Sequence, residues 1–155
     1  MSLKQKITVK MKQAMKDRDV KSLPTLRLII AAIKDKEIAC RGCEEGVSDS
    51  ISEDEIRAIL SKMVRQRRES EKAYEEAGRL ELAEQEREEA KIIAGFLPKP
   101  LTEDEETAAI AAAITETGAD SIRDMGKVMG LLKERHQGQM DFASVGPQVR
   151  ARLSA

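Results

Sequence analysis

An all-α fold is the class that this sequence of 155 residues predicts, and three observations support it. First, aromatic residues make up 2% of the chain and Trp is absent, so Leu, Ile, Met, Val and Ala must build the core. Second, apolar residues recur at the three- and four-residue spacing of amphipathic helices. Third, capping patterns and glycines mark where successive helices begin and end.

The first two predicted helices precede a polar loop that begins at Gly42. An apolar stripe with a four-residue period places the first helix at about 3–16. Its members are Leu3, Ile7, Met11 and Met15. The second helix is predicted to have Ser22 as its N-cap and Pro24 in its first turn, and to end at Gly42.

The third and fourth helices are predicted to form an antiparallel hairpin. Ser52 and Glu55 make a capping box before the third helix, which we expect at about 53–77. Gly78 ends that helix, and a turn of two residues leads into the fourth, at about 80–95. The inward positions predicted for the fourth helix are Leu82, Ala83, Ala90 and Ile93.

Polar residues interrupt the apolar stripes of this hairpin at Arg67, Ser70 and Glu86. An unpaired charge in such a position would be costly. We therefore expect Arg67 to lie in the seam between the two helices, bonded to Glu86 or Glu89, with Ser70 close by. The predicted role of these residues is structural and not catalytic.

A proline-rich segment divides the chain into two blocks. Pro98 and Pro100 lack the N–H group that a continuing helix needs, and Thr102 opens a new capping box. The sequence thus predicts an N-terminal domain of four helices over residues 1–97 and a C-terminal domain of three helices over 98–155. Pro98 is expected to act as part of a semi-rigid spacer between them.

The C-terminal block contains an unusual glycine pair. Its helices are expected at about 103–117, from about 121 onward, and at about 144–153, where Pro147 would lie in the first turn. Gly126 and Gly130 lie four residues apart, on one face of the middle helix, with Lys127 and Lys133 nearby. Such a pair either admits a neighbouring helix closely or exposes backbone to a ligand. In the second case these four residues are the candidate nucleic-acid-binding residues.

The sequence offers little for catalysis, metals or cofactors. His136 is the only histidine, and Cys40 and Cys43 form a single C-x-x-C without a second ligand pair. Neither of the glycine-rich nucleotide-binding motifs is present. We expect no catalytic residues, no cofactor and no metal. With no apolar run long enough for a membrane span and no signal sequence, we expect a cytoplasmic protein without a membrane partner.

Charge is unevenly distributed along the chain. Residues 1–41 hold 11 basic and 4 acidic side chains, a net charge of +7, whereas residues 42–97 hold 9 and 15, a net charge of −6. The basic front is suited to a polyanion or an acidic protein surface, although such charges also occur on ordinary solvated helix faces. Because aromatic residues are scarce, any RNA contact should involve backbone and shape and not splayed bases.

Several segments together resemble the YqeY-like family. They are "LRLIIAAIKDKE" (26–37), "RQRRES" (65–70), "AGRLELAEQEREE" (77–89), "FLPKPLTEDE" (96–105) and "DMGKVMGLLKE" (124–134). The family is related to the C-terminal tail of GatB, the B subunit of glutamyl/aspartyl-tRNA amidotransferase. The resemblance implies an all-helical protein in two blocks, of which the second is similar to the part of the amidotransferase that contacts tRNA.

Three interpretations of function follow from the residues and this resemblance. The first is a non-catalytic accessory module that binds tRNA or another RNA. The second is a helical adaptor that binds a protein, such as an amidotransferase subunit, and no RNA. The third, with the least support, is a carbon–nitrogen ligase using glutamine as amido-N donor, which the family label implies but for which no active site is readable.

Overall fold

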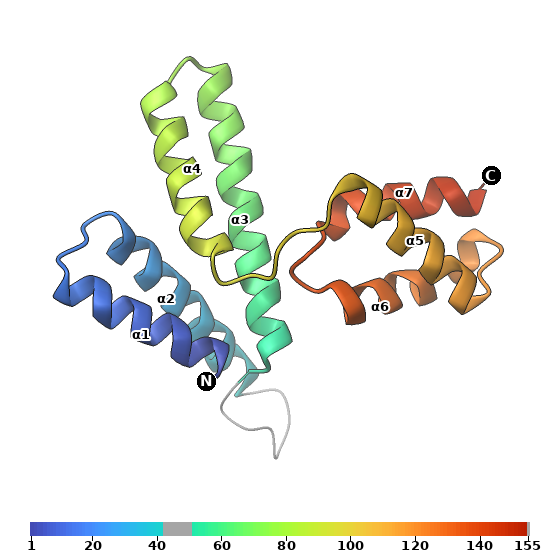
Figure 1. The fold of residues 1–155 in the computed structure, drawn as a ribbon, viewed down its shortest axis with the longest axis horizontal. Helices are drawn as coiled ribbons and strands as arrows, with labels where there is room; N and C mark the ends of the chain where they lie inside the picture. The colour runs from blue at the N-terminus through green and yellow to red at the C-terminus, as the bar shows by residue number, and fades with distance from the viewer. Residues whose placement is uncertain (42–50, 155) are drawn as a thin grey trace. The chain divides into compact units, whose positions relative to one another are not determined.

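The computed structural model describes residues 1–41 and 51–154, and this part of the chain is helical without strands (Figure 1). Seven α-helices and one short 3-10 turn, η1, follow one another along it. Their bounds are α1 Leu3–Lys16, α2 Ser22–Cys40, α3 Glu53–Glu76, α4 Leu80–Ala94, α5 Glu103–Thr117, η1 Ile122–Asp124, α6 Met125–His136 and α7 Phe142–Ser154. The all-α prediction is therefore confirmed. The predictions for Gly42 and Cys43 lie outside the described residues.

Side-chain caps and left-handed glycines set most helix ends. Ser52 and Thr102 each form the predicted capping box, at the start of α3 and α5. Gly118 ends α5 with a φ of 64°, and Gly78 follows α3 with a φ of 73°, a conformation that favours glycine. The predicted cap at Ser22 is wrong. The Asp19 carboxylate accepts hydrogen bonds from the N–H groups of residues 21 and 22, so the chain already turns before Ser22.

The contacts between residues divide the chain into two compact units, Met1–Leu97 and Pro98–Ala155. In the first unit, α3 and α4 run side by side in opposite directions, and α1 and α2 pack against the lower part of this hairpin (Figure 1). The buried residues of its core come from all four helices. They are Leu3, Ile7, Ala14, Leu26, Ile29, Ile33, Ile56, Leu60, Met63 and Ile93.

Two predicted core positions of the first unit are exposed instead. Met15 is 50% exposed and Ala14 is buried in its place. A strict four-residue period drifts by about 40° per step around a helix of 3.6 residues per turn, so the stripe has rotated out of the core by Met15. Leu82 is 37% exposed, whereas the next residue, Ala83, is 2% exposed, so Ala83 occupies the inner position of α4 there and Leu82 lies at the edge of the apolar stripe.

The second unit has a separate core between α5, α6 and α7. Its buried residues are Ile110, Ala113, Val128, Leu132, Met140, Val145, Val149 and Leu153. The last helix begins earlier than predicted, at Phe142, because Asp141 accepts hydrogen bonds from the backbone N–H groups of Ala143 and Val145. Pro147 therefore lies inside α7 and not in its first turn. Likewise, α6 begins only at Met125, after η1.

The segment between the units is tied down on both sides of Pro98. Phe96 and Leu97 pack against the first core. On the other side, the Leu101 N–H donates to the Gln139 carbonyl, and the Gln139 side chain donates to the carbonyl of Lys99. The flexible length between the two units is therefore short.

Limited proteolysis should cut the chain between about Phe96 and Thr102. We expect a stable fragment that contains the first unit, because this unit has its own core. A protease of broad specificity is needed, since trypsin does not cleave the Lys99–Pro100 bond. Mass spectrometry of the fragments locates the cut. If the whole chain is degraded together with no cut in this window, the two-domain interpretation is wrong.

Candidate nucleic-acid interface

Helix α6 has one buried and one open face. Val128 and Leu132 are 0% and 1% exposed and fix the inner face against α5 and α7. Gly126 and Gly130 both lie on the exposed side of the helix. Gly126 is in the first turn of α6, where the positive end of the helix dipole favours an anion, and the N–H of the preceding Met125 already donates to the Ile122 carbonyl of η1.

The glycine pair faces open space in the part of the chain that the structure describes. Apart from the adjacent residues and the nearby backbone of α6 itself, a Cβ atom added to Gly126 or to Gly130 would meet no atom of these residues within 4 Å. The sequence left two explanations open for these glycines, and one of them was close packing of a neighbouring helix. Within the described part of their own unit no helix packs against them, so this explanation does not apply there. They leave a strip of helix backbone uncovered.

The two candidate lysines flank this strip and are exposed. Lys127 extends into solvent, with its Nζ atom 4.0 Å from Asp124 Oδ1. Hydrogen bonds, first of all from the backbone N–H of Asp120, lower the pKa of Asp124, so this carboxylate stays ionised and partly neutralises Lys127. The Lys133 Nζ atom lies 6.0 Å from the centre of the Phe142 ring, so its side chain leans toward the start of α7.

Two charged residues near the strip were not singled out from the sequence. Glu134 follows Gly130 by four residues, so this exposed carboxylate lies on the glycine face and opposes an anionic ligand. Arg135 forms an ion pair with Glu116 of α5, at 2.6 Å, which lowers the pKa of Glu116 and holds the guanidinium away from the strip. The four-residue spacing from Gly130 could have identified Glu134 from the sequence. The ion pair between Arg135 and Glu116 could be found only from the structure.

Other features of the described residues do not suggest a different site. They contain no cluster of three or more side chains that could hold a metal ion. None of their helices is long and apolar enough to span a bilayer. A hollow of about 430 Å³ on the second unit is lined by polar residues, two of them glutamates. These are Glu103, Glu106, Thr107, Ser144 and Gln148. Two carboxylates make this hollow unsuitable for a phosphate.

In the hairpin, Arg67 lies between two glutamates of α4. Its Nε atom is 2.9 Å from Glu89 Oε2 and 3.8 Å from Glu86 Oε2, and all three side chains are about one-fifth exposed. Neither oxygen is aligned with the Nε–H bond, so these contacts are ionic and not hydrogen bonds. Ser70, one turn further along α3, is half-buried, and Pro98 is half-buried in the linker. The geometry fits the structural role predicted for Arg67 and Glu86.

One family model spans the hairpin, the linker and the glycine-bearing helix. The model described as "Yqey-like protein" matches residues 4–153, nearly the whole chain. The chain belongs to the Yqey-like family. No curated protein matches it. Within this Yqey-like chain, the match covers both units, and so includes the Arg67 seam as well as the α6 strip.

Replacing Gly126 and Gly130 with Ala should stabilise the Yqey-like chain, and the double variant tests whether the strip is an RNA-binding site. Each replacement adds about 1 kcal/mol of helix propensity, and the added methyl groups meet nothing. The same methyl groups would cover the backbone strip. Thermal unfolding and tRNA binding measured on the double variant check this. Gly118→Ala is the control, because its φ of 64° strains an alanine and should lower stability. If the double variant binds tRNA as the unaltered chain does, the strip is not part of an RNA-binding site.

Glu86→Gln should stabilise the chain at neutral pH and lose this effect in acid. Burial, together with the Glu89 carboxylate, raises the pKa of Glu86 against the opposing effect of Arg67. Between the unfolded-state value of 4.5 and the raised folded-state value, the folded chain binds more protons, so Glu86 lowers stability as the pH rises. Denaturant unfolding of both proteins at pH 7 and below pH 4.5 measures the difference. An equal gain at both pH values would contradict this account of Glu86.

Proposed function

We propose that this Yqey-like chain is a non-catalytic module that binds RNA through the exposed strip of α6, and that the class of RNA is tRNA. The observation that carries the proposal is the uncovered backbone at Gly126 and Gly130, with Lys127 and Lys133 beside it. A phosphate can approach the helix backbone closely where no side chain covers it, near the positive N-terminal end of α6, and lysines supply the charge that holds it.

The composition of the chain supports recognition of phosphates and shape. With one Tyr, two Phe and no Trp, the chain offers few surfaces on which unpaired bases could stack. Folded RNA presents phosphates and 2′-hydroxyl groups, which can be recognised without base stacking. The resemblance of residues 98–155 to the tail of GatB favours tRNA within this class. We place the protein in the cytoplasm, with the RNA-binding domain at 98–155 and a separate helical domain at 1–97.

Filter binding of bulk tRNA over a series of salt concentrations tests the proposal. We expect the logarithm of the association constant to fall linearly with the logarithm of the salt concentration, as for a complex held by phosphate contacts. Absence of binding at low salt, or binding that does not depend on salt, would contradict the proposal.

A protein adaptor without RNA binding is the second candidate, and the charge of the hairpin favours it. Residues 69–89 hold nine acidic and three basic side chains, a net charge of −6, which repels RNA and attracts a basic protein surface. Capture of a purified amidotransferase subunit by the chain, with no binding of tRNA at low salt, would favour this second candidate over the first.

A further inference from the structure

Helix α1 presents a basic face that the proposed RNA site does not use. It carries five lysines and no acidic residue. Lys4 is paired with the buried Glu37, at 2.6 Å, but the other four lysines form no ion pair with any residue that the structure describes. Val9 lies on the outer side of this helix and is 52% exposed. Lys6 and Lys12, three residues to either side, flank it on the same face.

The free end of the α3–α4 hairpin has the opposite character. The main apolar cluster of the first unit reaches Val64 on α3 and Ile92 on α4. Farther toward the free end, the buried apolar residues that the structure describes are the small side chains of Ala83 and Ala90. Beyond Val64 and Ile92 the two helices extend past α1 and α2 (Figure 1).

This hairpin end, residues 69–89, has a formal net charge of −6, which falls to −3 when Arg65, Arg67 and Lys91, which pair with its glutamates from just outside it, are counted. It also exposes two apolar side chains at the start of α4, Leu80 at 68% and Leu82 at 37%.

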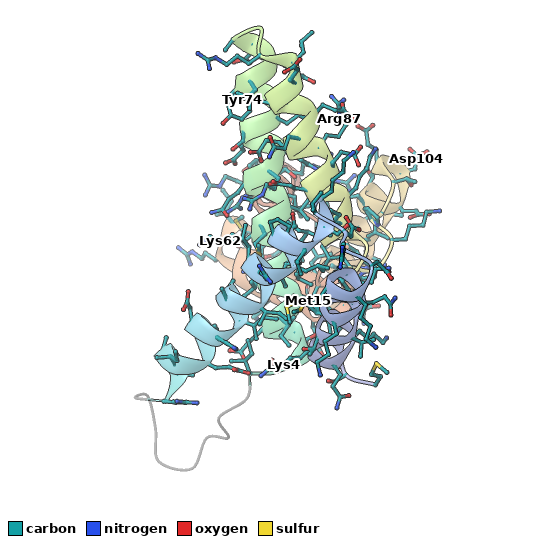
Figure 2. The ribbon with its side chains drawn as sticks, turned by 90° about the vertical axis from the view of Figure 1, so that its left-hand side faces the viewer. Lys4, Met15, Lys62, Tyr74, Arg87 and Asp104 are labelled. Atoms are coloured by element: carbon teal, nitrogen blue, oxygen red, sulfur yellow. The ribbon has the colours of Figure 1, made fainter. Side chains whose placement is uncertain are left out.

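We propose that the hairpin end of one copy of the chain binds α1 of a second copy. The two surfaces have opposite charge, and each carries exposed apolar side chains that water exclusion would favour burying. Within one chain the two surfaces lie apart, since Tyr74 and Arg87 on the hairpin end are well separated from Met15 and, still more, from Lys4 on α1 (Figure 2). A second copy supplies both surfaces in complementary form.

Reciprocal contacts close this assembly as a dimer. If α1 of each copy lies on the hairpin end of the other, both contacts are made at once and are related by a two-fold axis. A specific interface needs roughly 1,000 Å² of buried surface, and two contacts bury more than one. The pairing uses no residue of α6, so it stands independently of the proposed RNA binding.

Analytical ultracentrifugation of the full chain tests this pairing. We expect a dimer at low salt and dissociation toward monomer near 1 M salt, where the Debye length falls to about 3 Å. Two charge-reversed variants make the test specific. One carries Glu76→Lys, Glu81→Lys and Glu88→Lys on the hairpin end, and the other carries Lys6→Glu, Lys12→Glu and Lys16→Glu on α1. Each variant alone should be monomeric, because like charges then face each other.

An equimolar mixture of the two variants should restore the dimer, because each reversed surface again meets its opposite. The matched control Arg150→Glu with Arg152→Glu reverses exposed charges on α7 and should leave the dimer unchanged. Circular dichroism confirms that every variant is folded. A dimer that survives either reversal, or a mixture that stays monomeric, would overturn the proposal. An unaltered chain that is monomeric at every salt concentration would also overturn it, and would leave the hairpin end to a basic surface on another protein.

Discussion

Replacing Lys127 and Lys133 together with Gln should lower the affinity of the chain for tRNA roughly tenfold at physiological salt, through the loss of about two phosphate contacts. The loss should be similar for different RNA sequences, because phosphate contacts carry no base information. The slope of the affinity against salt should fall by about two, and filter binding measures both quantities. Both side chains are exposed and their replacement should leave stability unchanged.

The structure also selects the control for this experiment. Lys4 is unsuitable because it pairs with the buried Glu37, so its loss would disturb the first unit. Lys6, Lys10 and Lys12 are exposed on α1 and form no ion pair with the described residues. Their joint replacement with Gln should reduce tRNA binding less than the α6 variant. If the α6 variant and the unaltered chain bind tRNA equally well, the assignment of the site to α6 is wrong.

Arg67→Ala should lower the free energy of unfolding by about 2 kcal/mol, since it leaves two partly buried glutamates without their cation. The mechanism predicts a partial rescue. Adding Glu86→Gln to Arg67→Ala removes one of the two uncompensated charges and should recover part of the loss. Denaturant unfolding gives both values.

Arg68→Ala is the matched control for the seam. Arg68 is the next residue along α3, but it is exposed and pairs with no described carboxylate, so its loss should change stability by less than about 0.5 kcal/mol. If Arg67→Ala and Arg68→Ala cost the same, the seam contributes nothing specific to the hairpin.

Features of this fold that depend on local sequence could be predicted well. The capping boxes at Ser52 and Thr102 and the left-handed turn at Gly118 are set by residues within one helical turn. Polar residues on an apolar stripe also carried information, because Arg67 and Glu86 interrupt facing stripes and the structure brings them together.

Features that depend on which helix surfaces are covered by a neighbouring helix could not be predicted from the sequence. Leu82 has the spacing of a core residue, but Ala83 occupies the inner position of α4 there and Leu82 lies at the edge of the apolar stripe. Whether Gly126 and Gly130 are covered depends on the direction in which α5 and α7 cross α6, which the spacing of residues does not contain. Ser22 does not cap α2, because the carboxylate of Asp19 in the preceding turn already accepts the N–H groups of Lys21 and Ser22 and the helix begins at Ser22 itself.

Titration of ¹⁵N-labelled chain with tRNA, followed by amide chemical shifts, tests the central claim most directly. Glycine amides resonate in an uncrowded region of the spectrum, so Gly126 and Gly130 can be followed individually. We predict that these two amides and that of Lys127 shift or broaden first as tRNA is added, and that the shifts diminish as salt is raised. Shifts confined to residues 1–97, or a spectrum that does not change with tRNA at low salt, would contradict the account.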